Sequence, residues 1–299
     1  MRMDRKPVKG FRNFFRLGGN VLNVTLLWLM SCSAAPKRPA QTVTVRNIAE
    51  SRLGLANKEA DQGKYENALN ILKEVRGLAV RVDDPRLLIR EGLSRGNILY
   101  TLGREGEAAE VWNRALAEAE SAGEQELAGA VRIYMARSAL LAGGSAAAGV
   151  RERVSREIAA MKEEKLFIAF GWIVIGLAEK ERGRWTEGED AIRRALGIHE
   201  KHRYLEQAAY DWYLIASIRS LAGRYDAALE ALRKAVAFDR RSENTYGLGT
   251  DWRALGDVHK KAGSQAEALA AYRRAIDIFR SLGLEQEASA VEARLDNVY

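Results

Sequence analysis

The chain has 299 residues, of which 47% are hydrophobic and 29% are charged, with 26 Gly, 4 Pro and one Cys. This composition is typical of a globular protein, so it excludes a disordered or collagen-like chain. A single cysteine also excludes an intrachain disulfide framework and a multi-cysteine metal site.

The positive charge is concentrated at the N-terminus. The formal net charge is +7, from 47 basic and 40 acidic residues. Six basic residues and one acidic residue precede residue 32, a net +5, which leaves +2 for the remainder. Because the body of the chain is nearly neutral, we expect no nucleic-acid partner.

Residues 1–31 have the order of a secretory signal peptide: a basic segment, an apolar segment and small residues. The apolar part, from Val21 to Met30, is far shorter than the roughly 20 residues of a membrane-spanning helix. We therefore predict that this segment directs export.

The end of this segment, Leu29-Met30-Ser31-Cys32, resembles the lipobox of bacterial lipoproteins. The resemblance implies that Cys32 is lipidated and becomes the first residue, with acyl chains that anchor the protein to a membrane. Ser33, rather than Asp, implies export to the outer membrane, facing the periplasm. The alternative is an incidental or buried cysteine after an ordinary signal peptide or an amphipathic leader.

Residues 32–41 contain two prolines and no apolar periodicity, so we expect an extended tether there.

A 40-residue repeat follows the tether. It is marked by glycines at a constant step, which we number as position 15 of each unit: Gly63, Gly103, Gly143, Gly183, Gly223 and Gly263. Position 8 is small in all six units: Ala56, Gly96, Ala136, Gly176, Ala216 and Gly256.

The apolar spacing within each unit predicts two amphipathic helices. Positions 4, 7, 8 and 11 form one stripe of a helix A, and positions 20, 24 and 27 form one stripe of a helix B. Glycine at position 15 supplies the turn between them, and small residues at positions 8 and 20 allow the helix axes to approach closely. The pattern predicts one helical hairpin repeated six times.

Trp252, Leu255 and Gly256, followed by Ala268 and Tyr272, resemble the signature of the tetratricopeptide repeat. The similarity spans about residues 49–288 and implies an all-α, right-handed α–α superhelix of about six hairpins over residues 42–288. Residues 289–299 are expected to form a capping helix that covers the last apolar face.

Two features depart from this family. The period is 40 residues rather than 34, so we expect longer helices or longer connections. The third unit is degraded, with Gly143-Gly144 at the turn and Glu152 and Ser155 at positions where apolar residues belong, which could bend the array or open a contact surface.

Catalytic and metal-binding patterns are not found. His199 and His202 are three residues apart, whereas the zinc-protease motif needs histidines four apart, so we expect a solvated connection between units there and no metal. The sequence has no phosphate-binding glycine loop and no recognisable nucleophile with its base. We therefore expect neither enzymatic activity nor a cofactor.

The concave wall of such a superhelix is lined by helix A, at positions 2, 5, 9 and 12. The predicted partner-binding residues are Asn57, Asn97, Tyr100, Arg137, Phe170, Ile173, Tyr210, Tyr213, Ser217, Arg253 and Asp257. The two asparagines are similar to those that hold peptide in chaperone-binding members of the family. Those members also need a lysine where this chain has Leu53 and Leu93, so an acidic C-terminal tail is not the expected ligand.

Two functions are consistent with these patterns. The first is a lipid-anchored adaptor or scaffold in the bacterial cell envelope, which binds other envelope proteins or peptides in an apolar and aromatic groove. The second is a lipoprotein that holds a small amphipathic ligand as an accessory to a transporter.

Overall fold

The computed structural model describes residues 44–143 and 149–296. The chain divides between Thr44 and Val45 into two units, and the unit Val45–Tyr299 is described here by itself. The predicted signal peptide, the lipidation residue Cys32 and the tether up to residue 41 lie outside the described residues.

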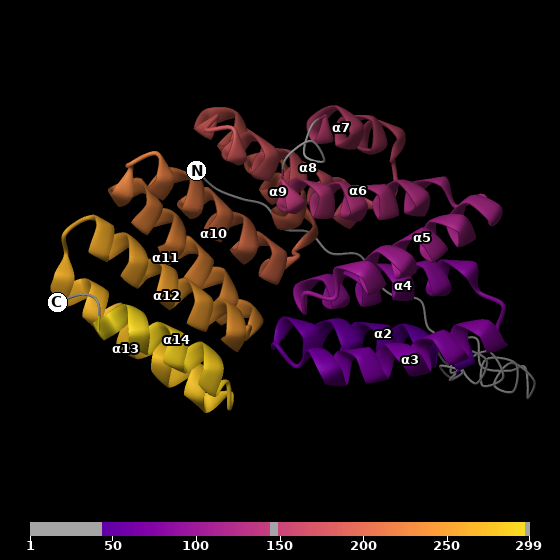
Figure 1. Cartoon of the computed structure of the whole chain (residues 1–299), viewed down its shortest axis with the longest axis horizontal. Helices are drawn as coiled ribbons and strands as arrows, with labels where there is room; N and C mark the ends of the chain where they lie inside the picture. The colour runs from indigo at the N-terminus through magenta and orange to yellow at the C-terminus, as the bar shows by residue number, and fades with distance from the viewer. Residues whose placement is uncertain (1–43, 144–148, 297–299) are drawn as a thin grey trace, which may run out of the picture. The chain divides into compact units, whose positions relative to one another are not determined.

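The described residues form thirteen α-helices and no strand (Figure 1). The helices are α2 (Val45–Asp61), α3 (Tyr65–Arg81), α4 (Pro85–Thr101), α5 (Glu105–Ser121), α6 (Gln125–Ala142), α7 (Val150–Ala160), α8 (Lys165–Glu181), α9 (Trp185–His202), α10 (Leu205–Leu221), α11 (Tyr225–Ser242), α12 (Thr245–Lys261), α13 (Gln265–Ser281) and α14 (Glu285–Asp296).

Consecutive helices pack as hairpins, from α2–α3 to α12–α13, and each hairpin packs against the next. The even-numbered helices are the predicted helices A, and the odd-numbered ones are the helices B. The prediction of an all-α solenoid of six hairpins is confirmed. The last helix begins at Glu285, so its first turn precedes the boundary that we placed between residues 288 and 289.

Longer helices explain the 40-residue period. Each of α2, α3, α4 and α5 has 17 residues, and the connections between them have three residues each. The six glycines at position 15 have φ angles between +70° and +79°, in the left-handed region. Only glycine adopts this conformation without steric cost, which is why the turn recurs at the same place.

Three helices A approach their helix B so closely that the contact needs a glycine. A Cβ atom added to Gly96 would lie 2.2 Å from Nε1 of Trp112, and one on Gly176 would lie 2.5 Å from Cδ1 of Ile192. Position 8 therefore makes room for the bulky residue at position 24 of the same hairpin.

In each of the last three hairpins, a basic side chain lies over the ring of the tryptophan at position 4. The guanidinium carbon of Arg194 lies 4.5 Å from the ring centroid of Trp172, and the ammonium nitrogen of Lys234 lies 4.3 Å from that of Trp212. Arg274 repeats this contact over Trp252, at 4.7 Å. Each cation comes from helix B of the same hairpin, so these contacts join the two helices of the pair.

The third hairpin differs from the others, as the degraded sequence of the third unit indicates. Helix α7 has only 11 residues and begins after Gly149. Its buried side chains are those of Val150 and Val154, whereas Glu152 and Ser155 are exposed. The apolar stripe has shifted by one or two residues because α7 begins late, so the 40-residue numbering does not place its buried face.

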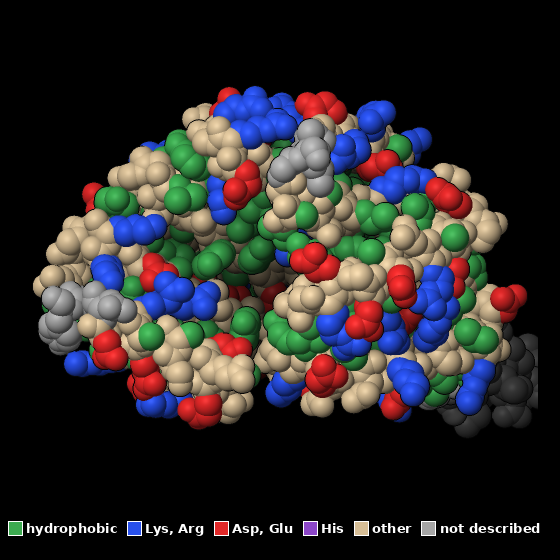
Figure 2. Space-filling model, in the orientation of Figure 1, with side chains coloured by type: hydrophobic (Ala, Val, Ile, Leu, Met, Phe, Trp, Pro, Cys, Tyr) green, Lys and Arg blue, Asp and Glu red, His purple; other side chains and the backbone are tan. Residues whose placement is uncertain are grey.

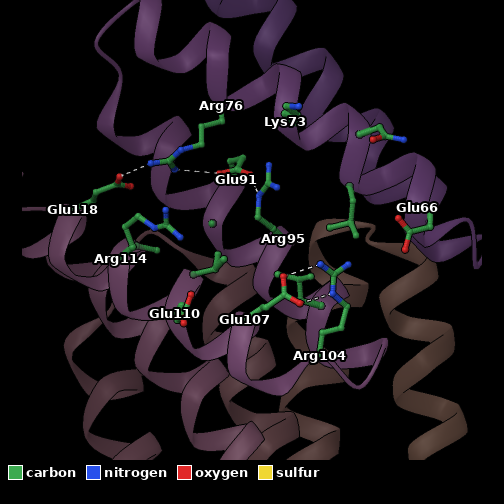
Figure 3. Close-up of a pocket in the computed structure, with 16 residues that line it drawn as sticks. Glu66, Lys73, Arg76, Glu91, Arg95, Arg104, Glu107, Glu110, Arg114 and Glu118 are labelled. Carbon is green, nitrogen blue, oxygen red and sulfur yellow. Dashed lines mark hydrogen bonds and ion pairs between the residues drawn. The ribbon is translucent and has the colours of Figure 1, made fainter.

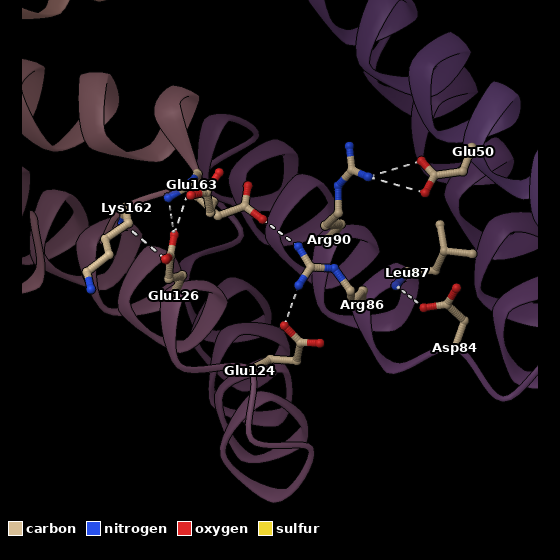
Figure 4. A network of polar contacts seen from close by, with 10 residues as sticks. Glu50, Asp84, Arg86, Leu87, Arg90, Glu124, Glu126, Lys162 and Glu163 are labelled. Atoms are coloured by element: carbon tan, nitrogen blue, oxygen red, sulfur yellow. Dashed lines mark hydrogen bonds and ion pairs between the residues drawn. The ribbon is translucent and has the colours of Figure 1, made fainter. Parts of the chain in front are cut away.

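Acidic and basic side chains hold the segment between α7 and α8 to neighbouring hairpins (Figure 4). The Glu126 carboxylate accepts hydrogen bonds from the backbone N–H groups of Lys162, Glu163 and Glu164, each at 3.0 Å. Arg86 donates to Glu164 at 2.6 Å and also contacts Glu124. The solenoid is therefore continuous through its shortest helix.

In the part of the chain that the structure describes, no helix has the length and apolar character that crossing a membrane requires.

The close approach at position 8 makes a testable prediction. Replacing Gly96 by Ala should lower the free energy of unfolding by about 1–3 kcal/mol, because the new methyl group overlaps the Trp112 ring. The matched control is Gly54→Ala in α2, where a Cβ would meet nothing within 4 Å, and this change should raise stability by about 0.5–1 kcal/mol. Urea denaturation measures both, and equal effects of the two substitutions would contradict the packing described here.

Candidate functional site

A groove with a volume of about 590 Å³ runs along the even-numbered helices. Its walls come from α2, α4, α6, α8, α10 and α12, with additional residues at the start of α3 and near the ends of α9 and α11. Figure 2 shows a recess on this face with hydrophobic side chains in its walls. The groove follows from the fold, because each helix A presents the face that is not packed against its helix B.

The first and last hairpins meet at one end of this groove. A Cβ atom on Gly63, in the turn between α2 and α3, would lie 3.4 Å from Cε2 of Tyr246 in α12 and 3.8 Å from Leu284, just before α14. Burial and the neighbouring Tyr246 raise the pKa of Tyr65 to about 12. Tyr65 and Tyr246 both line the groove, so residues nearly 200 positions apart share this site.

Aromatic side chains form much of the wall. Tyr134 of α6 stacks on Phe170 of α8 with ring centroids 4.4 Å apart, and Phe167 packs edge-on against Tyr134 at 6.5 Å. On α10, Tyr210 stacks on Tyr213 at 6.2 Å, and 45% of the Tyr210 surface is exposed. An apolar or aromatic ligand group could stack on these rings.

The structure brings six of the predicted binding residues to this groove: Asn57, Asn97, Phe170, Ile173, Tyr210 and Tyr213. The other five are not among its lining residues: Tyr100, Arg137, Ser217, Arg253 and Asp257.

Internal contacts engage three of those five. Arg137 donates to Oδ1 of Asn97 at 3.2 Å and lies 5.9 Å from the ring centroid of Tyr100. Asp257 accepts a hydrogen bond from the hydroxyl of Tyr272 at 2.7 Å. A partner-binding role for any of the predicted residues stays a prediction.

Four carboxyl groups in the groove wall were not predicted. They belong to Asp61, Glu206, Asp239 and Asp251, and the only Lys or Arg in the lining is Arg90. Although Asp61 is exposed, the concave walls replace much of the surrounding water, and this burial together with Glu206 raises the pKa of Asp61 to about 6. The groove is thus aromatic and acidic.

Two of these acids are unusual among the buried carboxyl groups. The described residues include seven: Asp84, Glu91, Glu179, Glu189, Asp211, Asp239 and Asp251. Five of them have an Arg or His partner. The exceptions are Asp239, which accepts a hydrogen bond from Asn244 at 3.0 Å, and Asp251, whose Oδ2 has no hydrogen-bond partner.

The pKa values of this pair follow from its surroundings. Burial raises the pKa of Asp251 to about 9, with a further contribution from the nearby Asp239. Burial also raises the pKa of Asp239 to about 7, with Glu206 adding to the effect and Asn244 opposing it. Near neutral pH the pair therefore retains at least one proton.

The preceding interface carries a different pair. His199 of α9 is buried, and its Nδ1 lies 2.6 Å from Oδ2 of Asp211 in α10. Our expectation that the segment around His199 is a solvated connection is therefore wrong for this residue, because the last turn of α9 packs against α10. Burial raises the pKa of Asp211 to about 6, although His199 opposes the rise.

The sequence contained a signal for these residues. His199 and Asp239 both occupy position 31, where the first two units have Ala79 and Ala119. Asp211 and Asp251 likewise share position 3, where the third unit has Val131 and the second has Glu91, an acid paired with Arg95. Polar residues at both positions of one interface, where Ala79, Ala119 or Val131 stand in other units, point to a specialised interface. No group of three or more metal-ligating side chains occurs among residues 44–143 and 149–296.

A second cavity, of about 480 Å³, lies over α3, α4 and α5 (Figure 3). Several of its charged side chains are paired with one another, and the lining also contains Glu66, Lys73, Glu110 and Arg114. Arg76 donates to Glu91 at 3.4 Å and to Glu118 at 3.1 Å, and Arg104 donates to Glu107 at 2.7 Å. Because its buried carboxyl group, Glu91, is paired with arginines and its lining has no aromatic side chain, this cavity is a weaker candidate than the groove.

The unpartnered carboxyl group predicts a pH-dependent gain in stability on substitution. In the folded state the pKa of Asp251 is raised from 3.8 to about 9. Its contribution to the free energy of unfolding is therefore fully present below about pH 4 and is lost as the pH rises toward 9. Asp251→Asn removes this loss and should raise the free energy of unfolding by about 1–3 kcal/mol at pH 7.5, with a smaller change at pH 4.5.

Thermal unfolding followed by circular dichroism at the two pH values makes this measurement. The control is Asp277→Asn, which removes an exposed carboxylate of α13 outside the groove lining. If Asp251→Asn lowered stability at pH 7.5, the description of this pair would be wrong.

Residues 206–281, which include nearly all of α10–α13, match the family model described as tetratricopeptide repeat. No curated protein matches this chain in sequence.

Solved structures of similar fold include three bacterial or regulatory proteins. A Rap protein complexed with competence and sporulation factor has a TM-score of 0.55 and 15% identity, over 92% of this chain and 79% of that one. PlcR of Bacillus thuringiensis, in complex with the peptide PapR7 and DNA, has a TM-score of 0.52 and 14% identity, over 82% of this chain and 74% of that one. PilW, a type IV pilus biogenesis factor, has a TM-score of 0.51 and 14% identity, over 82% of this chain and 98% of that one.

These identities show similarity of fold alone. The matched model is that of a repeat and indicates no catalytic family. The described residues from Val45 onward thus have the fold of a tetratricopeptide-like α-solenoid, whose hairpins α10–α11 and α12–α13 carry the repeat itself.

Proposed function

We propose that this protein is an adaptor that binds peptide or protein segments in the groove, held in the bacterial cell envelope by a lipid on Cys32. The observation that carries the binding part is the groove of about 590 Å³ on the even-numbered helices. Aromatic rings and carboxyl groups line this groove. We expect the anchor to place the protein at the outer membrane, facing the periplasm.

The geometry favours an extended or helical segment as the ligand. The groove draws side chains from six successive hairpins, so a bound segment could contact several units at once. Asn57 and Asn97 lie in this lining and carry amide groups that could hydrogen-bond a peptide backbone. The stacked pair Tyr210 and Tyr213 offers rigid aromatic surface, which is typical of residues that dominate binding energy.

The comparisons are consistent with this proposal. The Rap protein was solved with competence and sporulation factor and PlcR with the peptide PapR7, so two proteins of similar fold hold a partner of this kind. The DNA in the PlcR complex is not carried over, because the body of this chain is nearly neutral.

Binding in the groove is tested by Tyr210→Ala. The probe is a 12-residue peptide selected from a random displayed library on the full-length protein. We expect the substitution to weaken its binding by about tenfold, because the exposed ring of Tyr210 is a stacking surface. The control is Leu221→Ala, which removes a side chain that is 49% exposed on the same helix but lies outside the groove lining. Equal losses in the two variants, measured by calorimetry, would place binding elsewhere.

The anchor is tested separately by Cys32→Ser. If Cys32 is lipidated, the variant should leave the membrane fraction after cell lysis, whereas the native protein should stay with it. Fractionation followed by detection of the protein in each fraction measures this, with mass spectrometry of the native N-terminus to detect the lipid. A variant that still partitions fully with membranes would remove the anchoring proposal without affecting the groove.

A small amphipathic ligand is the second candidate. The volume of the groove lies within the roughly 300–1,000 Å³ of small-molecule sites, and its wall combines aromatic and acidic groups. Native mass spectrometry of the gently purified protein separates the candidates, since the absence of a co-purifying small molecule would count against this one.

A further inference from the structure

We propose that the groove recognises a lysine or arginine side chain of its bound segment, and that this cation lies against Asp239 and Asp251 at the interface of α11 and α12. This inference rests on the proposed function, because it names the chemistry by which the groove selects a peptide. It depends on four structural features, which are the buried pair, the preceding interface, the charge of the lining and the space beside the pair.

Asp239 and Asp251 lack the basic partner that the other buried carboxyl groups have. Asp239 is 3% exposed and Asp251 is 2% exposed, and both line the groove. The other five buried carboxyl groups of the described residues contact Arg or His, and Glu189 alone contacts three arginines. A buried carboxyl group is stabilised only when a cation or hydrogen-bond donors replace the water that it has lost. For Oδ2 of Asp251 no side chain or backbone group of the described residues does so.

The preceding interface shows what is missing. Forty residues earlier, the position of Asp239 is held by His199 and that of Asp251 by Asp211. In that interface the imidazole and the carboxylate form a buried pair at 2.6 Å. At the interface of α11 and α12, Asp239 replaces the histidine. This interface therefore has two acids where the preceding one has a histidine and an acid. The same repeat geometry therefore leaves the second interface without the imidazole partner that the first one has.

The charge of the surrounding wall favours a cation from outside the chain. Glu206 of α10 lies near Asp239, and Asp61 of α2 lies near Glu206. The side chains that shift the pKa values of the pair are Asn244, Glu206 and Asp239, none of them basic, and the one histidine of the lining, His199, is paired with Asp211. Arg90, the single Arg or Lys of the lining, is bound to Glu50 at 3.0 Å. The carboxyl groups outnumber the one engaged arginine, so the groove keeps a negative potential that attracts basic segments even while the pair retains a proton.

The space beside the pair is that of the groove itself, because Asp239 and Asp251 both line it. Gly247 lies against Asp239, where a Cβ would come within 2.1 Å of Oδ2, so this carboxyl group is held at the groove wall by a residue without a side chain. Gly247, Tyr246 and Thr250 line the groove next to the pair. An alkyl stem could lie along Tyr246 while its charged end reaches the carboxyl groups.

The test uses two displayed libraries of random 12-residue peptides, identical except that one central residue is Lys in the first and Gln in the second. Both are selected on the full-length native protein, on the Asp239→Asn/Asp251→Asn variant and on the control Asp277→Asn. The variant should fold, because it removes buried charge, and circular dichroism checks this. Selected peptides and their Lys→Gln counterparts are then compared by calorimetry in a buffer that contains a chelator, which removes metal ions as competitors.

We expect the Lys library to yield binders to the native protein that are about tenfold or more tighter than their Gln counterparts. The double variant should bind both forms with less than a twofold difference, and Asp277→Asn should behave as the native protein does. Binding of the Lys peptide near pH 7 should also release roughly one proton, seen as a binding enthalpy that depends on the ionisation enthalpy of the buffer.

Three results would overturn the inference. If Lys and Gln peptides bound the native protein equally well, with binding still lost in Tyr210→Ala, the groove would bind peptides without selecting a cation, and only this inference would fail. If the double variant kept the preference for Lys, the cation would lie elsewhere. If neither library yielded a binder that Tyr210→Ala weakens, the proposed function itself would fail, and this inference with it.

Discussion

The burial of each helix's apolar stripe against its neighbours is the constraint on which the rest of this structure depends. No hairpin can cover its own apolar side, so each one needs the next, and the array ends with α14 over the last exposed face. Within a hairpin, the contact of Gly96 with Trp112 and that of Gly256 with Tyr272 bring the two helices close together. This packing uses one face of every even-numbered helix and leaves the other face for the groove.

The same constraint explains why the acidic pair is costly and why its place matters. Positions 3 and 31 lie at the contact between successive hairpins, where other units bury small or apolar side chains, such as Ala79, Ala119 and Val131, or an acid paired with arginine, Glu91. Placing Asp239 and Asp251 there removes two carboxyl groups from water without an internal cation. Such a pair adds no stability by itself, which is consistent with the cation-binding role that we propose for it. The stacked tyrosines of α10 lie in the same groove and add apolar contact area.

Much of the architecture could be predicted from the sequence because its signals are periodic. The recurring glycines located the turns, and the small residues at position 8 located the close helix contacts. The third hairpin could not be predicted in this way, because α7 begins late and Val150 and Val154 replace the expected positions. The helices proved longer than those of the 34-residue family repeat, with connections of three residues in the first hairpins.

The site was harder to predict than the fold. Positions 2, 5 and 9 of helix A gave six residues of the groove, including Phe170 and Tyr213, because they follow from helical geometry alone. The acids at the end of α2 and in α11 and α12 depend on contacts between different hairpins, and no spacing within one unit reveals these. His199 was misjudged for the same reason, because its partner Asp211 lies in the next hairpin.

The measurement that tests this account most directly is a carbon-13 NMR titration of the side-chain carboxyl groups of Asp239 and Asp251 in the full-length protein. The account predicts that they titrate with pKa values of about 7 and about 9, because both are buried beside each other without a cation. Titration of both groups near pH 4, the range of ordinary aspartates, would show that water or a basic side chain already satisfies them, and would contradict the central claim.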